Sequence, residues 1–145
     1  MLANVVTDYL EKRISDKMER VEIKEGNSLF LRIVAEASDF GDIELYDDGD
    51  EVTIIFGRFT HSHYNNYDDI PQEEKELRIA EDVFEALDAT LNDRYEFWGA
   101  HEGPGGFRDV EYVNKQNQGI VSRVFGRGSL KTFYRWSGAA RQIKC

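Results

Sequence analysis

Two histidines separated by one residue, His61 and His63, are the side chains best suited by type and spacing to chemistry. Alternate residues of a strand point to the same face, so both imidazoles can face one ion, and zinc accepts imidazole nitrogens as ligands. Asp68, Asp69 or His101 could supply a third ligand, which would give a metal-dependent enzyme. H-x-H pairs are also common without a metal, and nothing fixes the third ligand. We therefore favour hydrogen-bonded histidines and predict no cofactor.

The motifs of other catalytic classes are missing from the sequence. The glycines of segment 103–106 lack the Lys-Ser/Thr pair of a phosphate-binding P-loop, and the Gly-Arg-Gly of 126–128 matches no dinucleotide fingerprint. No serine stands in a G-x-S-x-G elbow. A single cysteine, Cys145, allows neither a disulfide within these residues nor a cysteine cluster for zinc. These absences favour a protein that binds over one that catalyses.

Charge is strongly polarised along the sequence. The net charge is −10, but residues 112–145 contain seven bases and no acid, whereas residues 1–111 contain the other 11 bases and all 28 acids. Either the basic segment folds against the acidic body, residues 1–111, and the two neutralise each other, or a large negative surface remains exposed to solvent. A negative surface would repel nucleic acid and membrane phosphates and would attract a basic partner at a raised on-rate.

The basic segment suggests one further class, a nucleic-acid binder. Its aromatic side chains alternate with four bases, Arg123, Arg127, Lys131 and Arg135. Such a surface could stack on single strands. The acidic body raises the electrostatic cost of approaching a phosphate backbone, so nucleic-acid binding is disfavoured.

The element that should position the histidines is a β-hairpin within residues 41–60. Two runs of alternating apolar residues flank Asp48-Gly49, and Asp-Gly is the strongest short signal for a two-residue type I′ turn. With these two residues as the loop, Leu45 would pair with Val52. One face of the hairpin is then apolar, and the two histidines share the opposite face.

Two amphipathic helices are predicted to cover the apolar face of the hairpin. The first spans residues 2–18, where apolar positions recur every three or four residues. The second spans residues 71–91, with Pro71 in its first turn, Asp69 as its cap, and acids near the positive end of the helix dipole. Its predicted buried stripe is Leu77, Ala80, Val83, Phe84, Leu87 and Leu91.

Shorter apolar runs predict the remaining strands, 21–23, 29–35, 95–98, 120–125 and 130–136. The last two should pair around a turn at 126–129, and the glycine-rich segment 99–107 reads as a loop. The prediction is an α+β fold, with a mainly antiparallel sheet and two helices packed on one face. The chain of 145 residues fits one domain, residues 1–145. With no apolar run near the about 18 residues of a membrane helix and no signal peptide, we expect a cytoplasmic protein.

From residue 39 to 106 the chain resembles the small cytoplasmic immunity proteins that accompany bacterial polymorphic and contact-dependent toxins. The similarity rests on a strand ending in F-T-H-x-H-Y, on the acid-led helix after it, and on an aromatic strand followed by a glycine-rich loop. It implies a non-enzymatic inhibitor that binds one cognate toxin and blocks its active site. If that toxin cleaves nucleic acid, a negative surface would mimic the phosphate backbone. The basic C-terminal segment departs from a uniformly acidic nuclease inhibitor.

The predicted function is therefore to bind and neutralise a cognate bacterial toxin through an acidic surface. The candidate contact residues lie at the hairpin tip, before the second helix and in the glycine-rich loop. They are Asp47, Asp48, Asp50, Glu51, Asp68, Asp69 and Glu102. The alternative is a metal-dependent enzyme that uses the His61/His63 pair.

Overall fold

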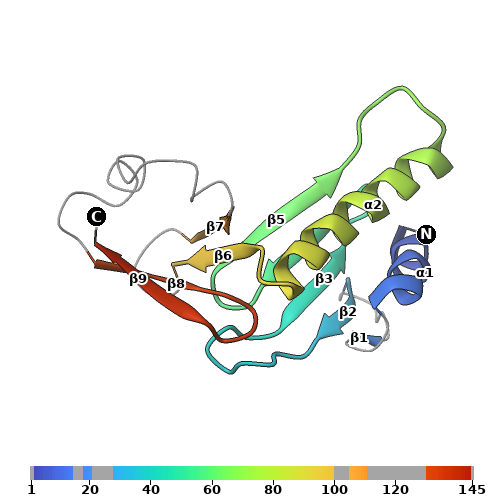
Figure 1. The fold of residues 1–145 in the computed structure, drawn as a ribbon. Coiled ribbons are helices and arrows are strands. Elements are labelled where there is room, and N and C mark those ends of the chain that lie inside the picture. Colours follow the sequence, from blue (N-terminus) through green and yellow to red (C-terminus); the bar gives the residue numbers. More distant parts are fainter. Residues whose placement is uncertain (1, 15–17, 21–27, 100–104, 111–129, 145) are drawn as a thin grey trace.

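A five-stranded antiparallel sheet forms the centre of the fold (Figure 1). The structure is a computed structural model, and it describes residues 2–14, 18–20, 28–99, 105–110 and 130–144. Within them, successive strands of this sheet lie side by side in chain order. They are β1 (Met18–Arg20), β2 (Leu29–Ile33), β3 (Ile43–Asp47), β4 (Glu51–Phe56) and β5 (Thr60–Asn65).

A second antiparallel sheet is built from the C-terminal part of the chain, in the strand order β7-β6-β8-β9. Its members are β6 (Tyr95–Trp98), β7 (Gly106–Asp109), β8 (Leu130–Tyr134) and β9 (Ala140–Lys144). Strand β6 pairs with β7 along its length and with β8 where Phe97 lies opposite Tyr134. The sequence did not predict this division into two sheets.

Both helices lie on one face of the five-stranded sheet (Figure 1). Helix α1 (Leu2–Ile14) and helix α2 (Gln72–Leu91) share one hydrophobic core with β3 and β4. The sheet contributes side chains that are fully buried, namely Ile43, Leu45, Val52, Ile54 and Phe56. The predicted α+β fold, mainly antiparallel sheet with two helices on one face, is confirmed.

An aromatic cluster joins the two sheets. The ring of Phe40, before β3, has its centroid 4.9 Å from that of Phe97 in β6 and 5.2 Å from that of Trp136 after β8. Phe56, at the end of β4, lies 5.3 Å from Phe97 between ring centroids. All four side chains are buried, so the two sheets share one hydrophobic core.

The β3–β4 hairpin turns one residue later than predicted. The Asp48 amide donates to the carbonyl of Glu51 at 3.0 Å, which makes Gly49 and Asp50 the two loop residues. Gly49 has a φ of +95°, whereas Asp50 is not among the residues with positive φ. Positive φ at the first loop position alone is the pattern of a type II′ turn, which favours glycine there. The glycine therefore takes the first loop position instead of the second.

This turn changes the predicted strand pairing but not the predicted faces. Leu45 pairs with Ile54, so the predicted pair with Val52 is wrong. The partner is displaced by two positions, and side chains along a strand repeat their facing every two residues. Each side chain of the hairpin therefore keeps its predicted face.

Helix α2 begins after Pro71 and buries a stripe rotated from the predicted one. Pro71 occupies the N-cap position without a side-chain cap, so the predicted capping by Asp69 is wrong. Leu77 is 44% exposed, whereas Ile79, which was not predicted, is buried. The other buried residues of the helix are Ala80, Val83, Ala86, Leu87, Ala89 and Thr90.

Other boundaries follow the predictions in part. Helix α1 ends at Ile14 instead of residue 18, and β7 begins at Gly106, within the segment 99–107 that was predicted as a loop. Strands β2 and β6 form where they were predicted. The predicted strands 21–23 and 120–125 lie outside the described residues. Strand β8 pairs with β9, which the sequence did not predict.

Candidate functional site

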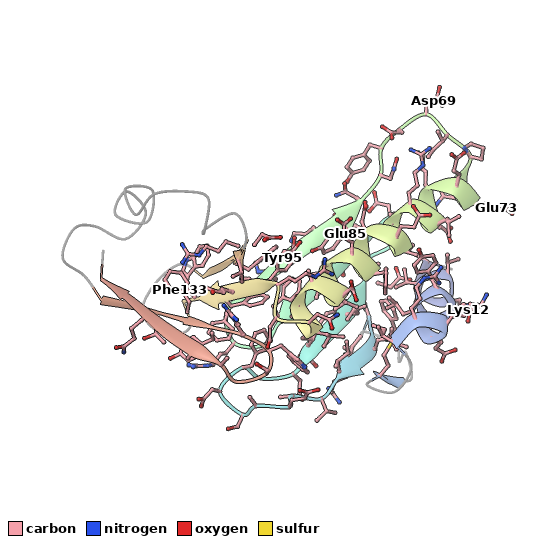
Figure 2. The ribbon with its side chains drawn as sticks, viewed as in Figure 1. Lys12, Asp69, Glu73, Glu85, Tyr95 and Phe133 are labelled. Carbon is pink, nitrogen blue, oxygen red and sulfur yellow. The ribbon has the colours of Figure 1, made fainter. Side chains whose placement is uncertain are left out.

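The strand register brings two predicted acidic loops to one end of the five-stranded sheet. Glu51, the first residue of β4, pairs with Asn65, the last residue of β5. The hairpin tip therefore lies beside the start of segment 66–71, which leads to α2, and Figure 2 shows Asp69 at the outer limit of that segment. We call the carboxylates of the hairpin tip and of this segment the acidic end; they are Asp48, Asp50, Glu51, Asp68 and Asp69.

Asp47 has a structural role at the tip of the β3–β4 hairpin. Its Oδ2 accepts a hydrogen bond from the backbone amide of Ala3 at 2.9 Å, in the first turn of α1. Its Oδ1 accepts one from the amide of Gly49 at 2.9 Å. A carboxylate at this place satisfies an amide that has no partner within the helix and complements the helix dipole. Asp47 therefore fastens α1 to the β3–β4 turn.

On the face of the sheet opposite the helices, Glu51 contacts His63, and Asp48 lies close to both. His63 Nδ1 lies 3.2 Å from Oε1 of Glu51 and 2.9 Å from Oγ1 of Thr53. The Thr53 hydroxyl also donates to Oδ2 of Asp48. A ligand atom from each of Asp48, Glu51 and His63 lies within 4.8 Å of the other two. The sequence named these three residues separately, and no motif links them.

Neighbouring side chains hold the two carboxylates in this arrangement. Asn65 Nδ2 donates to Oε2 of Glu51 at 3.2 Å, which leaves Oε1 directed at His63. Ser28 Oγ donates to Oδ1 of Asp48 at 3.5 Å. The sequence did not identify Asn65 or Ser28, because their role depends on contacts across strands.

His61 and His63 share a face, as their spacing predicted. They pair with Ile55 and Thr53 of β4, and their ring centroids are 5.2 Å apart in an edge-to-face arrangement. Asp68, proposed as a third ligand, has its Oδ2 3.8 Å from Nη1 of Arg78 on α2. The other proposed ligand, His101, lies outside the described residues, as does Glu102 of the predicted contact set.

Segment 66–71 presents an exposed aromatic ring beside its carboxylates. Tyr67 is 72% exposed. The Asp68 amide donates to Oδ1 of Asn66 at 2.9 Å, and the amide of Ile70 donates to the carbonyl of Asp68 at 2.9 Å. Together with the Asp68–Arg78 contact, these bonds fix the segment. Tyr67 was not among the predicted contact residues, although an aromatic residue within a polar run indicates such a contact.

A second group of acids lies on the exposed surface of α2. It consists of the exposed residues Glu73, Glu74, Glu81, Asp82 and Glu85. Arg78 partly neutralises it, because its Nη2 lies 2.9 Å from Oε1 of Glu74. This group supplies a comparison surface of the same charge that is separate from the β3–β4 tip.

The bases proposed to bind nucleic acid are only partly described. Arg135 Nη2 donates to Oε1 of Glu96 at 2.9 Å, and Glu96 is fully buried. A second base, Arg108, approaches the same carboxylate at 3.8 Å. Arg123, Arg127 and the side chain of Lys131 lie outside the described residues. For Arg135, the expectation that basic residues pack against the acidic body holds.

Burial perturbs two tyrosines close to the sheet. It raises the pKa of Tyr64 in β5, an effect that the hydrogen bond with Ser62 reduces and nearby Tyr95 and Asp82 reinforce. Burial is also the main reason why the pKa of Tyr95 is raised, and Glu85 adds to it. Both hydroxyls therefore stay protonated in the folded protein to a higher pH than in an unfolded chain.

Comparison of this chain with models of protein families, with curated proteins and with solved structures found no match. Among the described residues, no helix has both the length and the apolar composition needed to cross a membrane.

Proposed function

We propose that this protein is a binding protein without catalytic activity, of the immunity type, which captures and neutralises a cognate bacterial toxin. The acidic end is its contact surface. The partner presents a basic surface, as toxins that act on nucleic acid do. The resemblance of residues 39–106 to immunity proteins and the excess of acids in residues 1–111 support this function.

The observation that carries the proposal is the pairing of Glu51 with Asn65. Through this register, two loops that are separated in the sequence by β4 and β5 bring their carboxylates to one end of the sheet. Asp48, Asp50, Asp68 and Asp69 are all exposed there. A concentrated negative surface accelerates the capture of a positively charged partner and disfavours partners of the same sign.

Tyr67 strengthens the proposal, because it gives the acidic end an apolar contact. Tyrosine is enriched among the residues that dominate binding energy, typically with a polar rim around them. Here the ring is largely exposed, and Asp68 and Asp69 follow it directly in the chain. Hydrogen bonds within the segment hold it in place before binding, which lowers the entropy lost on association.

The test starts with the product of an adjacent gene, which should co-purify with this protein and be inhibited by it. A triple variant, Asp48→Asn, Asp50→Asn and Glu51→Gln, should weaken the complex by about 10- to 100-fold, the loss of about 1.4–2.8 kcal/mol. The matched control neutralises three acids of α2, with Glu81→Gln, Asp82→Asn and Glu85→Gln.

The two triple variants remove the same charge, so a difference between them locates the contact. We expect the α2 variant to lower only the association rate, by a few fold and more weakly at high salt. Equal loss of affinity in both variants would show that net charge, not the acidic end, attracts the partner. Failure of the neighbouring products to bind the wild-type protein would refute the proposed function itself.

A further inference from the structure

We propose that Asp48, Glu51 and His63 form a binding site for a divalent transition-metal ion, and that zinc suits its donors best. This site differs from the His61/His63 pair that the spacing suggested, because it combines one histidine with two carboxylates from the neighbouring hairpin tip. It does not depend on the proposed partner.

The ligand atoms already lie at separations close to those that one ion requires. Each is within 4.8 Å of the other two, and His63 Nδ1 is 3.2 Å from Oε1 of Glu51. Nitrogen and oxygen ligands bind zinc at about 2.0–2.2 Å, so two ligands of a tetrahedral ion lie about 3.3–3.6 Å apart. Small side-chain rotations would therefore complete the site.

The mixed donor set selects the class of ion. Calcium and magnesium prefer sites made entirely of oxygen ligands, whereas zinc accepts imidazole and carboxylate together. The ligand is the neutral imidazole in the tautomer that carries its proton on Nε2, so the ion takes the position at Nδ1 that a contact with Glu51 or Thr53 occupies. Three protein ligands leave the fourth position to water.

The surroundings of the three ligands resemble the supporting shell of a metal site. Asn65 binds Oε2 of Glu51, so that Oε1 remains directed at His63. Ser28 and Thr53 contact the two oxygens of Asp48 separately. Outer residues of this kind orient metal ligands and raise affinity. One imidazole nitrogen and two carboxylates have ligand atoms within 4.8 Å of one another, and neighbouring side chains hold each carboxylate, which carries the proposal beyond a group of surface acids.

The site is open to ions from solution. The side chain of His63 is 48% exposed and that of Glu51 is 25% exposed. Substitution of these residues should therefore leave the fold intact, which circular dichroism checks for each variant.

The experiment titrates chelator-treated full-length protein with zinc chloride in competition with a chromophoric chelator. One zinc ion per chain should bind at micromolar zinc, and magnesium and calcium should not displace it. His63→Ala and Glu51→Gln should each weaken binding by about 100-fold or more, since even loss of a supporting residue costs about 10- to 100-fold. Asn65→Ala should produce a smaller loss.

His61→Ala is the matched control, because it removes the neighbouring imidazole and leaves all three ligands in place. Its zinc affinity should equal that of the wild-type protein, and nitrogen chemical shifts should report zinc on His63 Nδ1. The proposal is overturned if the wild-type protein binds no zinc. It is also overturned if His61→Ala weakens binding as much as His63→Ala, because the two histidines would then form the site. Zinc is the only probe, so either result leaves the proposed toxin binding untouched.

Discussion

Replacement of Asp47 by alanine tests the division between structural and exposed carboxylates at the hairpin tip. The variant removes the acceptor for the Ala3 amide at the start of α1 and for the Gly49 amide in the turn. Loss of a helix cap costs about 0.5–2 kcal/mol, and loss of a negative charge near the helix N-terminus costs about 0.3–1 kcal/mol. The two contributions overlap, so we expect the free energy of unfolding to fall by about 1–2 kcal/mol.

Urea unfolding followed by circular dichroism at neutral pH measures this change. For a domain of about 150 residues, each kcal/mol shifts Tm by about 2–4 °C, so thermal unfolding should occur about 2–8 °C lower. Asp47→Asn keeps one oxygen acceptor and removes the charge, so it should lose about half as much stability as Asp47→Ala. Asp50→Ala is the matched control, because it removes the same charge from an exposed loop position.

The free energy of unfolding of Asp50→Ala should remain within about 0.5 kcal/mol of the wild-type value, as is usual for surface substitutions. Equal stabilities of Asp47→Ala and Asp50→Ala would refute the capping role. If Asp47→Ala instead weakened binding of the partner and left the free energy of unfolding unchanged, Asp47 would belong to the contact surface, as the sequence suggested.

Three further predictions concern stability. Gly57→Ala should lower the free energy of unfolding, measured in urea, by about 3 kcal/mol or more, because a Cβ there would lie 1.9 Å from a backbone carbonyl oxygen. Gly49→Ala should lower it by only about 1–2 kcal/mol, because its Cβ would meet nothing within 4 Å and the cost comes from the positive φ alone. In the same assay Ile79→Ala should lower the free energy of unfolding by about 2–4 kcal/mol, because Ile79 is buried, and Leu77→Ala by about 0.5 kcal/mol or less, because Leu77 is exposed. The reverse order would show that Leu77, as predicted from the sequence, belongs to the buried face of α2. Because burial raises the pKa of Tyr64 above 10.0, the folded state retains this proton longer, so stability should fall as pH rises past the unfolded value, and Tyr64→Phe should flatten that fall in unfolding measured across alkaline pH.

The sequence predicted the faces of the central hairpin better than its turn. Alternation of apolar residues determines which side chains face the helices, and this pattern survives a displacement of two positions. The prediction of the turn depended on which of the two loop positions the glycine occupies. Asp48-Gly49 fits a type I′ loop and Gly49-Asp50 fits a type II′ loop, and both are preferred two-residue hairpin turns. The hydrogen bond from Asp48 to Glu51 and the φ angles of the loop residues distinguish them.

The candidate site was predictable as separate residues but not as an arrangement. Glu51 and His63 belong to adjacent strands, and the turn at Gly57–Phe59 sets the register that brings them together. The histidines were predicted to end a strand of the same hairpin, which placed them on the correct face but without their carboxylate neighbours. Asp68 stands five residues from His63 in the chain, yet its carboxylate lies beside Arg78. Sequence distance was therefore a poor guide to the ligand set.

Acidic composition likewise overstates the charge available to a partner. Asp47 caps α1, Asp42 accepts the Ala35 amide at 2.8 Å, and buried Glu96 binds Arg135, so these carboxylates serve the fold. Asp50 and Asp69 are exposed at the acidic end and can act on a partner. Binding should therefore depend on where a carboxylate stands and not on the net charge of −10. Two variants of equal charge, one at the hairpin tip and one on α2, should then differ in affinity, because short-range contacts survive the screening that removes long-range attraction.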